Sequence, residues 1–203
     1  LSAVFPEIPR TLSACSLLAI LTVIHCASRQ TSGKFQQTFT ALKVALILIF
    51  CFIIFFWGSS PQNISLAPKL GDENILFSGV FAISLIYVNY AYTGWNAVTY
   101  VISELDEPQR NLPIVLFVGT LLVMLIYLLL NFIFLNAVPI KIIEGELEIG
   151  VIVANYALGD HAGKAMGAIL AVLLVSTVSA MTMAGPRVLQ VIGEDFKPFR
   201  SLS

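Results

Sequence analysis

A short run of aromatic, small and polar residues interrupts a long apolar stretch of the chain: Tyr90-Ala91-Tyr92-Thr93-Gly94-Trp95-Asn96. The apolar stretch, 75–102, would measure about 42 Å as one straight helix, whereas the hydrocarbon core of a bilayer is about 30 Å thick. Such a helix must tilt strongly, kink or break, and the expected point of a break is near Gly94. A break would free backbone carbonyl and amide groups, which can hold the ammonium and carboxylate of an amino acid.

A second interpretation of these residues is purely structural. A glycine kink packed against a neighbouring helix, with Tyr90 and Asn96 in ordinary interhelical contacts, needs no ligand. In the binding interpretation, the unwound backbone survives at membrane depth because it lines a cavity. The half-helix that begins near Trp95 would then point its positive end at an anionic group. The residues alone leave both interpretations open.

Two further sets of polar residues lie within apolar stretches. Lys43 lies near one end of the stretch 38–57, where a lysine either extends to the lipid headgroups or pairs with a group inside a helix bundle. A hydroxyl cluster lies in the stretch 163–185 and consists of Ser176, Thr177 and Ser179. Such hydroxyls can bond to the backbone of their own helix, so packing explains them as well as function does. Ser179 is the best functional candidate of the three.

The sequence shows no pattern of catalytic or metal-binding residues. His25 and His161 are isolated, and no His/Cys/Asp/Glu spacing resembles a metal site. The three cysteines lie in apolar stretches, where they are expected to act as small hydrophobic residues. An intramembrane hydrolase would need a serine and a histidine at the same depth, whereas both histidines lie at segment ends. We therefore expect no enzyme, no metal and no organic cofactor.

The composition of the chain indicates which secondary-structure elements position these residues. Charged residues make up 11% of the chain and apolar ones 58%, against about 25% and 45–50% in soluble domains. This indicates an all-α, polytopic transmembrane helix bundle, with 1–203 as a single transmembrane domain. The net charge of −1 gives no reason to expect a nucleic-acid partner. Membrane-spanning helices are expected at 11–27, 38–57, 75–103 (broken near 91–94), 113–136 and 163–185. The apolar segment 150–158 is too short to span and is expected outside the bundle, on the outer side.

Loop charge predicts the orientation of the helices. Seven basic residues are expected on one side: Arg29, Lys34, Lys43, Arg110, Arg187, Lys197 and Arg200. Four are expected on the other: Arg10, Lys69, Lys141 and Lys164. The positive-inside rule then places the first loop, the loop after 103 and the C-terminal tail in the cytoplasm. Asn63-Ile64-Ser65 falls on the outer side and fits a glycosylation sequon.

The block from Tyr90 to Pro113 resembles the sixth helix and following loop of the amino acid–polyamine–organocation superfamily. It is most similar to the L-type amino acid transporters and their bacterial relatives, whose pattern is aromatic-Ala-Tyr-x-Gly-Trp-Asn, then Glu, then Asn-Pro-x-Arg-Asn-x-Pro. Two residues depart from it, because Glu107 replaces the usual Asn and Thr93 stands where many L-type members have Gly. The resemblance implies a leucine-transporter-like fold of inverted repeats. It also implies that the chain is an internal fragment covering about the fourth to eighth helices.

The resemblance also implies roles for residues of the broken helix and favours the binding interpretation. Tyr90 would be a gating aromatic, Ala91 and Thr93 would offer backbone atoms to the substrate, and Trp95 and Asn96 would border the break around Gly94.

Other residues receive implied roles outside the broken helix. Lys43 would place its ammonium where sodium-coupled relatives hold sodium, facing the hydroxyls of the eighth helix. Glu104 and Arg110 would form an ion pair at the inner gate.

The function implied is secondary transport of amino acids by alternating access, as a permease or antiporter in the plasma membrane. The substrate would be a small molecule, an amino acid, and transport would be coupled to H⁺ or to an exchanged substrate. The sequence identifies no partner subunit. Two alternatives remain: a non-transporting membrane subunit or channel, in which 75–102 would be one continuous tilted helix, and an intramembrane hydrolase.

Overall fold

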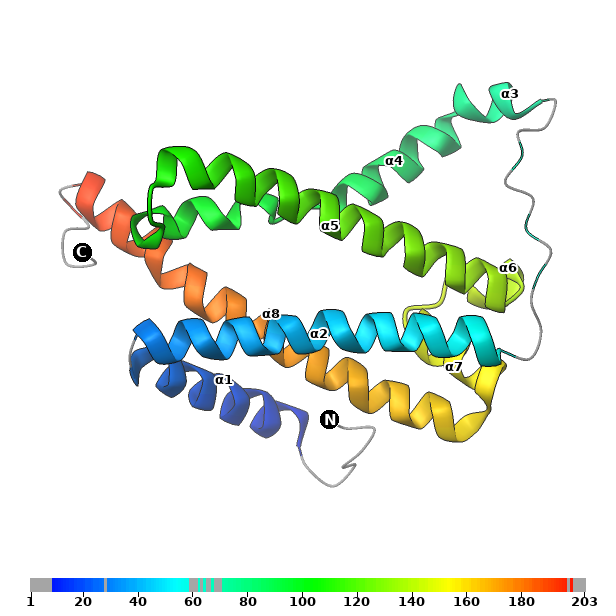
Figure 1. Cartoon of the computed structure of the whole chain (residues 1–203), viewed down its shortest axis with the longest axis horizontal. Coiled ribbons are helices and arrows are strands. Elements are labelled where there is room, and N and C mark those ends of the chain that lie inside the picture. The colour runs from blue at the N-terminus through cyan, green and yellow to red at the C-terminus, as the bar shows by residue number, and fades with distance from the viewer. Residues whose placement is uncertain are drawn as a thin grey trace. The chain divides into compact units, whose positions relative to one another are not determined.

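The protein is all-α in a computed structural model that describes residues 9–27, 29–58, 62, 64, 67, 71–196 and 198. The elements are α1 (Arg10–Ala27), α2 (Arg29–Trp57), α3 (Asp72–Leu76), α4 (Gly79–Ala91), the 3-10 helix η1 (Trp95–Glu104), α5 (Pro108–Ala137), α6 (Ile140–Ile143), α7 (Ile149–Leu158) and α8 (Asp160–Asp195) (Figure 1). No strand occurs in the described residues. The all-α fold class is therefore confirmed.

The chain divides into two compact units, each with its own contacts. One unit combines Leu1–Gln62 with Leu128–Ser203, and the other is Asn63–Tyr127. In the first unit α1, α2, α7 and α8 pack against one another. The second unit holds α3, α4, η1 and the first two thirds of α5. The division into two units does not test whether the chain forms a single transmembrane domain, which stays a prediction.

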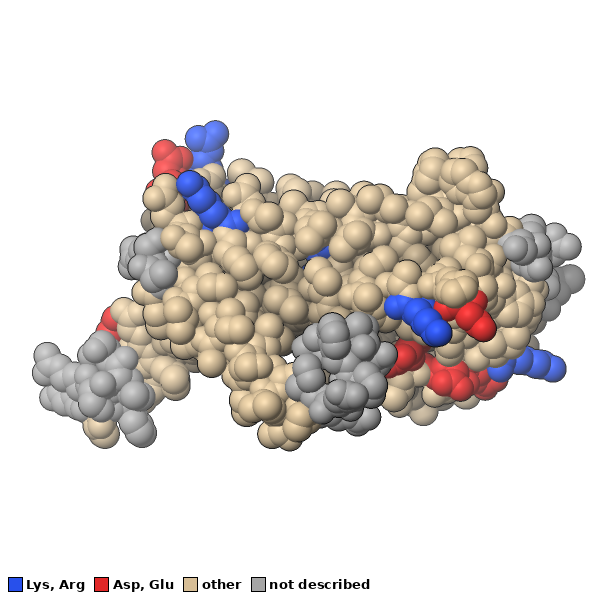
Figure 2. All heavy atoms as spheres, turned by 90° about the horizontal axis from the view of Figure 1, so that it is seen from below, with Lys and Arg blue, Asp and Glu red and all other residues tan. Residues whose placement is uncertain are grey.

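Three described helices are long and apolar enough to cross a membrane: Gln30–Trp57, Pro108–Ala137 and Asp160–Asp195. Two shorter apolar helices are Thr11–Cys26 and Ile149–Leu158. Charged side chains are sparse on the face shown in Figure 2, where other residues predominate. A soluble protein would bury much of this apolar surface, whereas a bilayer accepts it. The protein is accordingly an integral membrane protein.

The core of the first unit is built from α2, the end of α5, α7 and α8. Its buried members are Phe50, Cys51, Ile54, Ile133, Ala137, Val138, Val153, Ala154, Ala157 and Met166. The expectation that 150–158 lies outside the bundle is wrong, because α7 contributes three of these residues. Small residues explain the correction: Ala154 and Ala157 allow close approach of neighbouring helices, as small residues do in membrane interfaces.

Three helix boundaries differ from those expected. α2 begins at Arg29 rather than at 38, because the polar residues before the apolar stretch are compatible with a helix and merely lengthen it. α5 begins at Pro108 rather than 113; Pro108 occupies the first turn, where the missing N–H has no intrahelical partner in any case. α8 continues through Pro186 to Asp195 rather than stopping at 185. A proline removes one backbone bond and can kink a helix without ending it.

The stretch expected as one broken helix at 75–103 is interrupted twice. α3 ends at Leu76 and α4 begins at Gly79, where the Ser78 hydroxyl accepts a hydrogen bond from the Phe81 amide at 3.2 Å. This is an ordinary N-cap, and it separates a short helix from the apolar one. The second interruption lies beyond Ala91 and belongs to the candidate site.

The contact between α7 and α8 gives a first test. A Cβ at Gly163 would overlap the side-chain oxygen of Asn155, whereas a Cβ at Gly167 would meet nothing within 4 Å. We expect Gly163→Ala to lower the melting temperature of the purified protein, because Asn155 must move. Gly167→Ala, on the same helix, should leave the melting temperature unchanged or raise it. The free energy of unfolding should rise by at most about 1 kcal/mol, because alanine favours a helix over glycine. Equal shifts in the two variants would contradict the packing described.

Candidate functional site

The helix break lies where the sequence predicts it. α4 ends at Ala91, residues 92–94 form a turn, and Gly94 has a φ of 92°. The left-handed conformation is open to glycine without steric cost, which explains why the interruption is centred here. One detail differs from expectation, because the segment after the break is a 3-10 helix rather than an α-helix. A 3-10 run of this length is uncommon and often marks a hinge or a strained segment.

The last carbonyl groups of α4 receive new donors at the break. The Tyr90 carbonyl accepts from the Thr93 amide at 3.1 Å and from the Thr93 hydroxyl at 2.7 Å. The Ala91 carbonyl accepts from the Tyr127 hydroxyl at 3.0 Å, and the rings of Tyr92 and Tyr127 pack edge to face at 5.2 Å. The Tyr90 oxygen thereby uses both of its lone pairs, whereas the Ala91 oxygen keeps a second lone pair for another donor.

The amides on the other side of the break differ from these carbonyls. Within the described residues, the backbone N–H groups of Gly94, Trp95 and Asn96 donate to no backbone carbonyl. These are the unpaired donors that every helix has at its N-terminus, and they carry its partial positive charge. The break therefore offers donors suited to a carboxylate beside the Ala91 carbonyl, which can accept from an ammonium.

A cavity of about 410 Å³ opens at the break between η1 and α5, within the second unit. Ala91, Thr93, Gly94 and Trp95 line it, as do several residues that the sequence interpretation missed: Tyr92, Val98, Val115, Leu116, Gly119, Thr120, Val123 and Tyr127. Its size falls within the range of small-molecule sites. All of its lining side chains are uncharged, so its chemistry suits a neutral side chain.

Two predicted binding residues lie outside this lining. Tyr90 is 75% exposed, and the Asn96 amide donates to the Tyr100 hydroxyl at 3.2 Å. Among the missed residues, Tyr127 had a usable signal in the sequence. A tyrosine within an apolar helix must find a partner for its hydroxyl, and here that partner is a carbonyl released by the break.

The first unit brings together the predicted coupling residues. The Lys43 ammonium donates to the Thr177 hydroxyl at 3.0 Å, between α2 and α8. Ser176 is 1% exposed, and its hydroxyl has no partner within the part of the chain that the structure describes. Ser179 is fully buried and bonded to Gln36 and His25.

The contact between Ser179 and His25 corrects one expectation. Because both histidines lie at segment ends, no serine is expected at the depth of a histidine, yet Ser179 Oγ is 2.9 Å from His25 Nε2. The reason is that α1 and α8, which are distant in the sequence, pack against each other. The pair still lacks the features of a hydrolase, because the other ring nitrogen of His25 faces the Ser32 hydroxyl rather than a carboxylate.

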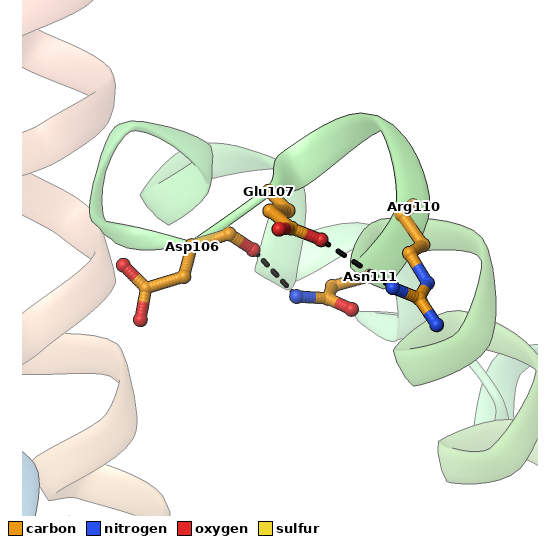
Figure 3. A network of polar contacts seen from close by, with 4 residues as sticks. All are labelled: Asp106, Glu107, Arg110 and Asn111. Carbon is orange, nitrogen blue, oxygen red and sulfur yellow. Dashed lines mark hydrogen bonds and ion pairs between the residues drawn. The ribbon is translucent and has the colours of Figure 1, made fainter.

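The predicted gate pair of Glu104 and Arg110 stays a prediction, and the loop before α5 shows another partner for Arg110. Arg110 forms an ion pair with Glu107 at 3.7 Å, and the side-chain amide of Asn111 donates to the Asp106 carbonyl at 2.6 Å (Figure 3). The side chain of Glu104 lies outside the described residues. Glu107 has a φ of 44°, a left-handed conformation that a residue other than glycine, asparagine or aspartate rarely adopts. This explains why an asparagine is usual at this position in the resembling pattern.

Several residues named in the sequence analysis lie outside the described residues. These are Lys69, Lys197 and Arg200, together with Asn63 and Ser65 of the possible sequon. The predicted sidedness of the loops and the sequon therefore stay predictions.

Comparison with known proteins assigns the family. A profile of the amino acid permease family matches residues 1–199, and the chain belongs to this family. It is 31% identical over 164 residues to the large neutral amino acids transporter small subunit 2 of Mus musculus, which covers 76% of this chain and 29% of that protein. It is 33% identical over 135 residues to the b(0,+)-type amino acid transporter 1 of Homo sapiens, which covers 62% of this chain and 26% of that protein. No solved structure gives a significant match.

These comparisons confirm the resemblance to L-type amino acid transporters. They do not favour the hydrolase, since the relatives are named as transporters rather than enzymes. The chain spans less than a third of the length of the relatives it matches.

The backbone of Glu107 gives a second prediction. Glu107→Asn should make the protein about 0.5–1 kcal/mol more stable, because asparagine tolerates the left-handed conformation and the exposed ion pair lost with Arg110 is worth only a few tenths of a kcal/mol. Glu107→Gln is the matched control: it also removes the ion pair but keeps the backbone cost. Melting temperatures of the purified variants measure both effects. A melting temperature for the asparagine variant at or below that of the glutamine variant would contradict this explanation.

The Tyr127 hydroxyl gives a third prediction. In the complete protein, Tyr127→Phe should reduce kcat/KM for transport about fivefold, since it removes one hydrogen bond worth about 1 kcal/mol and leaves the ring packing against Tyr92 in place. Tyr87→Phe, at an exposed position on α4, should change kcat/KM less than twofold. Initial uptake rates at matched protein levels measure the difference. If both variants behave alike, the hydroxyl does not support the break.

Proposed function

We propose that the complete protein transports amino acids across a membrane by alternating access, as a secondary active transporter or exchanger. The observation that carries this proposal is the break at residues 92–94, which puts unpaired amides, released carbonyls and a cavity in one place. Broken helices of this kind form substrate sites in secondary transporters. Membership in the amino acid permease family supports the same function, and the relatives are named as amino acid transporters.

The substrate would be held mainly by backbone atoms. Its carboxylate would accept from the amides of Gly94, Trp95 and Asn96, at the positive end of η1. Its ammonium would donate to carbonyls at the end of α4, around Ala91. The side chain would occupy the uncharged cavity, which favours neutral amino acids, as in the name of the large neutral amino acids transporter. Tyr90 would close over the site as the gating aromatic.

Coupling would take place where α2 meets α8. Lys43 is half-buried and bonded to Thr177, and the buried hydroxyl of Ser176 lies one residue away in the sequence. We propose that the Lys43 ammonium acts as a fixed cation there, so that either H⁺ or an exchanged amino acid drives the transport cycle, with no organic cofactor. Ser179 supports the same turn of α8.

The membrane orientation completes the proposal. By the family resemblance we place the protein in the plasma membrane. The bias in loop charge supports an orientation with the α1–α2 turn, the loop before α5 and the C-terminal tail in the cytoplasm. Arg110 would then belong to the inner gate together with Glu107 and Glu104. No partner subunit is proposed.

A transport assay on the complete protein tests the proposal and its coupling site. Proteoliposomes should take up a radiolabelled neutral amino acid, faster with either an inward proton gradient or an internal load of unlabelled amino acid. Lys43→Ala should reduce uptake at least tenfold or uncouple it from both driving forces, whereas Lys43→Arg should keep partial uptake because the charge remains.

The outcomes separate function from coupling. Absence of uptake and exchange by folded wild-type protein, over a panel of neutral amino acids, would overturn the transport proposal and favour a non-transporting membrane subunit. Normal coupled uptake by the alanine variant would instead show that Lys43 extends to the headgroups and has no role in coupling.

A further inference from the structure

A second buried polar cluster joins α1, α2 and α8, outside the cavity at the break. His25 of α1 lies between two serine hydroxyls, with Nδ1 2.6 Å from Ser32 Oγ and Nε2 2.9 Å from Ser179 Oγ. Ser179 in turn donates to Gln36 Oε1 at 2.9 Å. Ser32 is 5% exposed and Ser179 is fully buried. The Phe35 ring packs edge-on against the imidazole at 6.1 Å.

The direction of each hydrogen bond follows from the number of protons. The Gln36 amide is assigned with its oxygen toward Ser179 and its nitrogen toward the Thr40 hydroxyl, so the single hydroxyl proton of Ser179 is donated to Gln36. Ser179 can therefore only accept from His25, so Nε2 must carry a hydrogen. A neutral imidazole carries one N–H, which leaves Nδ1 as the acceptor from Ser32. The result is a directed chain of hydrogen bonds from Ser32 through His25 and Ser179 to Gln36.

The surroundings of the ring suit positioning rather than acid–base chemistry. Neither α1 nor α2 contains an aspartate or glutamate. The acidic residues of α8 lie near its ends, at Asp160, Glu194 and Asp195. Ser179 donates its hydroxyl proton to Gln36. The proton therefore does not point at the imidazole, as it would in a serine that a histidine activates as a nucleophile.

The cluster lies close to the contact between Lys43 and Thr177. Ser179 and Thr177 belong to the same turn of α8, and Gln36 precedes Lys43 by two turns of α2. The lysine side chain has four flexible carbons, so its ammonium can follow Thr177 over several positions but cannot by itself fix the helix. Buried bonds with directed donors at Ser179 can fix the rotation and the height of this turn.

We propose that His25 is a positioning residue that, as the Nε2–H tautomer bonded to Ser179, fixes the rotation and height of α8 and so holds Thr177 opposite Lys43. The importance of that contact for transport rests on the proposed function, whereas the tautomer and the positioning do not.

Two substitutions of His25 separate its two nitrogens. Glutamine places an amide nitrogen at the position of Nε2 and can still donate to Ser179. Asparagine places its amide at the position of Nδ1, so it can bond Ser32 but does not reach Ser179. In the complete protein, His25→Gln should have a melting temperature close to that of the wild type. His25→Asn should lower the melting temperature about as much as Ser179→Ala does.

Thr177→Val reports on the contact with Lys43 without any transport measurement. It should lower the melting temperature in the wild type and in His25→Gln, but not in His25→Asn, where the contact is already lost. Equal effects of Thr177→Val in all three backgrounds would overturn the positioning role. Glutamine and asparagine variants of equal stability would do the same.

Nitrogen-15 NMR of histidine-labelled protein tests the tautomer directly, with His25→Gln identifying the signal. We expect a protonated Nε2 and an unprotonated Nδ1, with Ser179→Ala shifting the first signal and Ser32→Ala the second. A protonated Nδ1 with a bare Nε2 would overturn the proposal. If the wild type fails to transport any amino acid while these results hold, the proposed function is wrong and the positioning role of His25 stands.

Discussion

A backbone carbonyl that loses its helical partner within a membrane must find another donor, because lipid supplies none. This constraint decides what the break between α4 and η1 can be. Thr93 supplies both its amide and its hydroxyl to Tyr90, and Tyr127 supplies its hydroxyl to Ala91. The carbonyls at the end of α4 are thereby stabilised without a ligand, while the amides at the start of η1 are left without backbone partners. The break thus has hydrogen-bonded carbonyls on one side and amides without backbone partners on the other, and such amides are suited to bind an anionic group.

The same constraint explains the polar contacts of the other unit. Lys43, Thr177, Ser179 and His25 lie where α1, α2 and α8 pack together, and other polar side chains such as Gln36 bond to them there. A buried polar group is costly unless it is bonded, so each one found here restricts how the helices can be arranged. Apolar contacts between helices tolerate sliding, but a donor that must meet a particular acceptor does not. The polar residues therefore specify the register of α1, α2 and α8 more strictly than the apolar core does.

The sequence predicts the features that follow from length and from single special residues. The 75–102 stretch must tilt strongly, kink or break to fit a bilayer, and Gly94 identifies the place of the interruption. The sequence also singles out Lys43 and the hydroxyls of α8, which the structure brings together. What it misses depends on partners distant in the sequence. Tyr127 is an isolated tyrosine until Ala91 is seen beside it, and His25 is an isolated histidine until Ser179 of α8 is seen beside it. Pro186 shows the limit of local rules, because the helix continues past a residue that usually ends one.

The 3-10 form of η1 has a mechanical consequence. Ten residues rise about 20 Å in a 3-10 helix but about 15 Å in an α-helix, and η1 contains 10 residues. Rewinding this segment as an α-helix would draw the loop at Leu105 toward Gly94 by about 5 Å, close to one turn of an α-helix. The unpaired amides at the start of η1 belong to its first turn. A ligand bound to them would therefore contact the segment whose pitch sets the distance from Gly94 to Leu105. Ligand binding near Gly94 and displacement of the loop at Leu105 would then both depend on the backbone of η1.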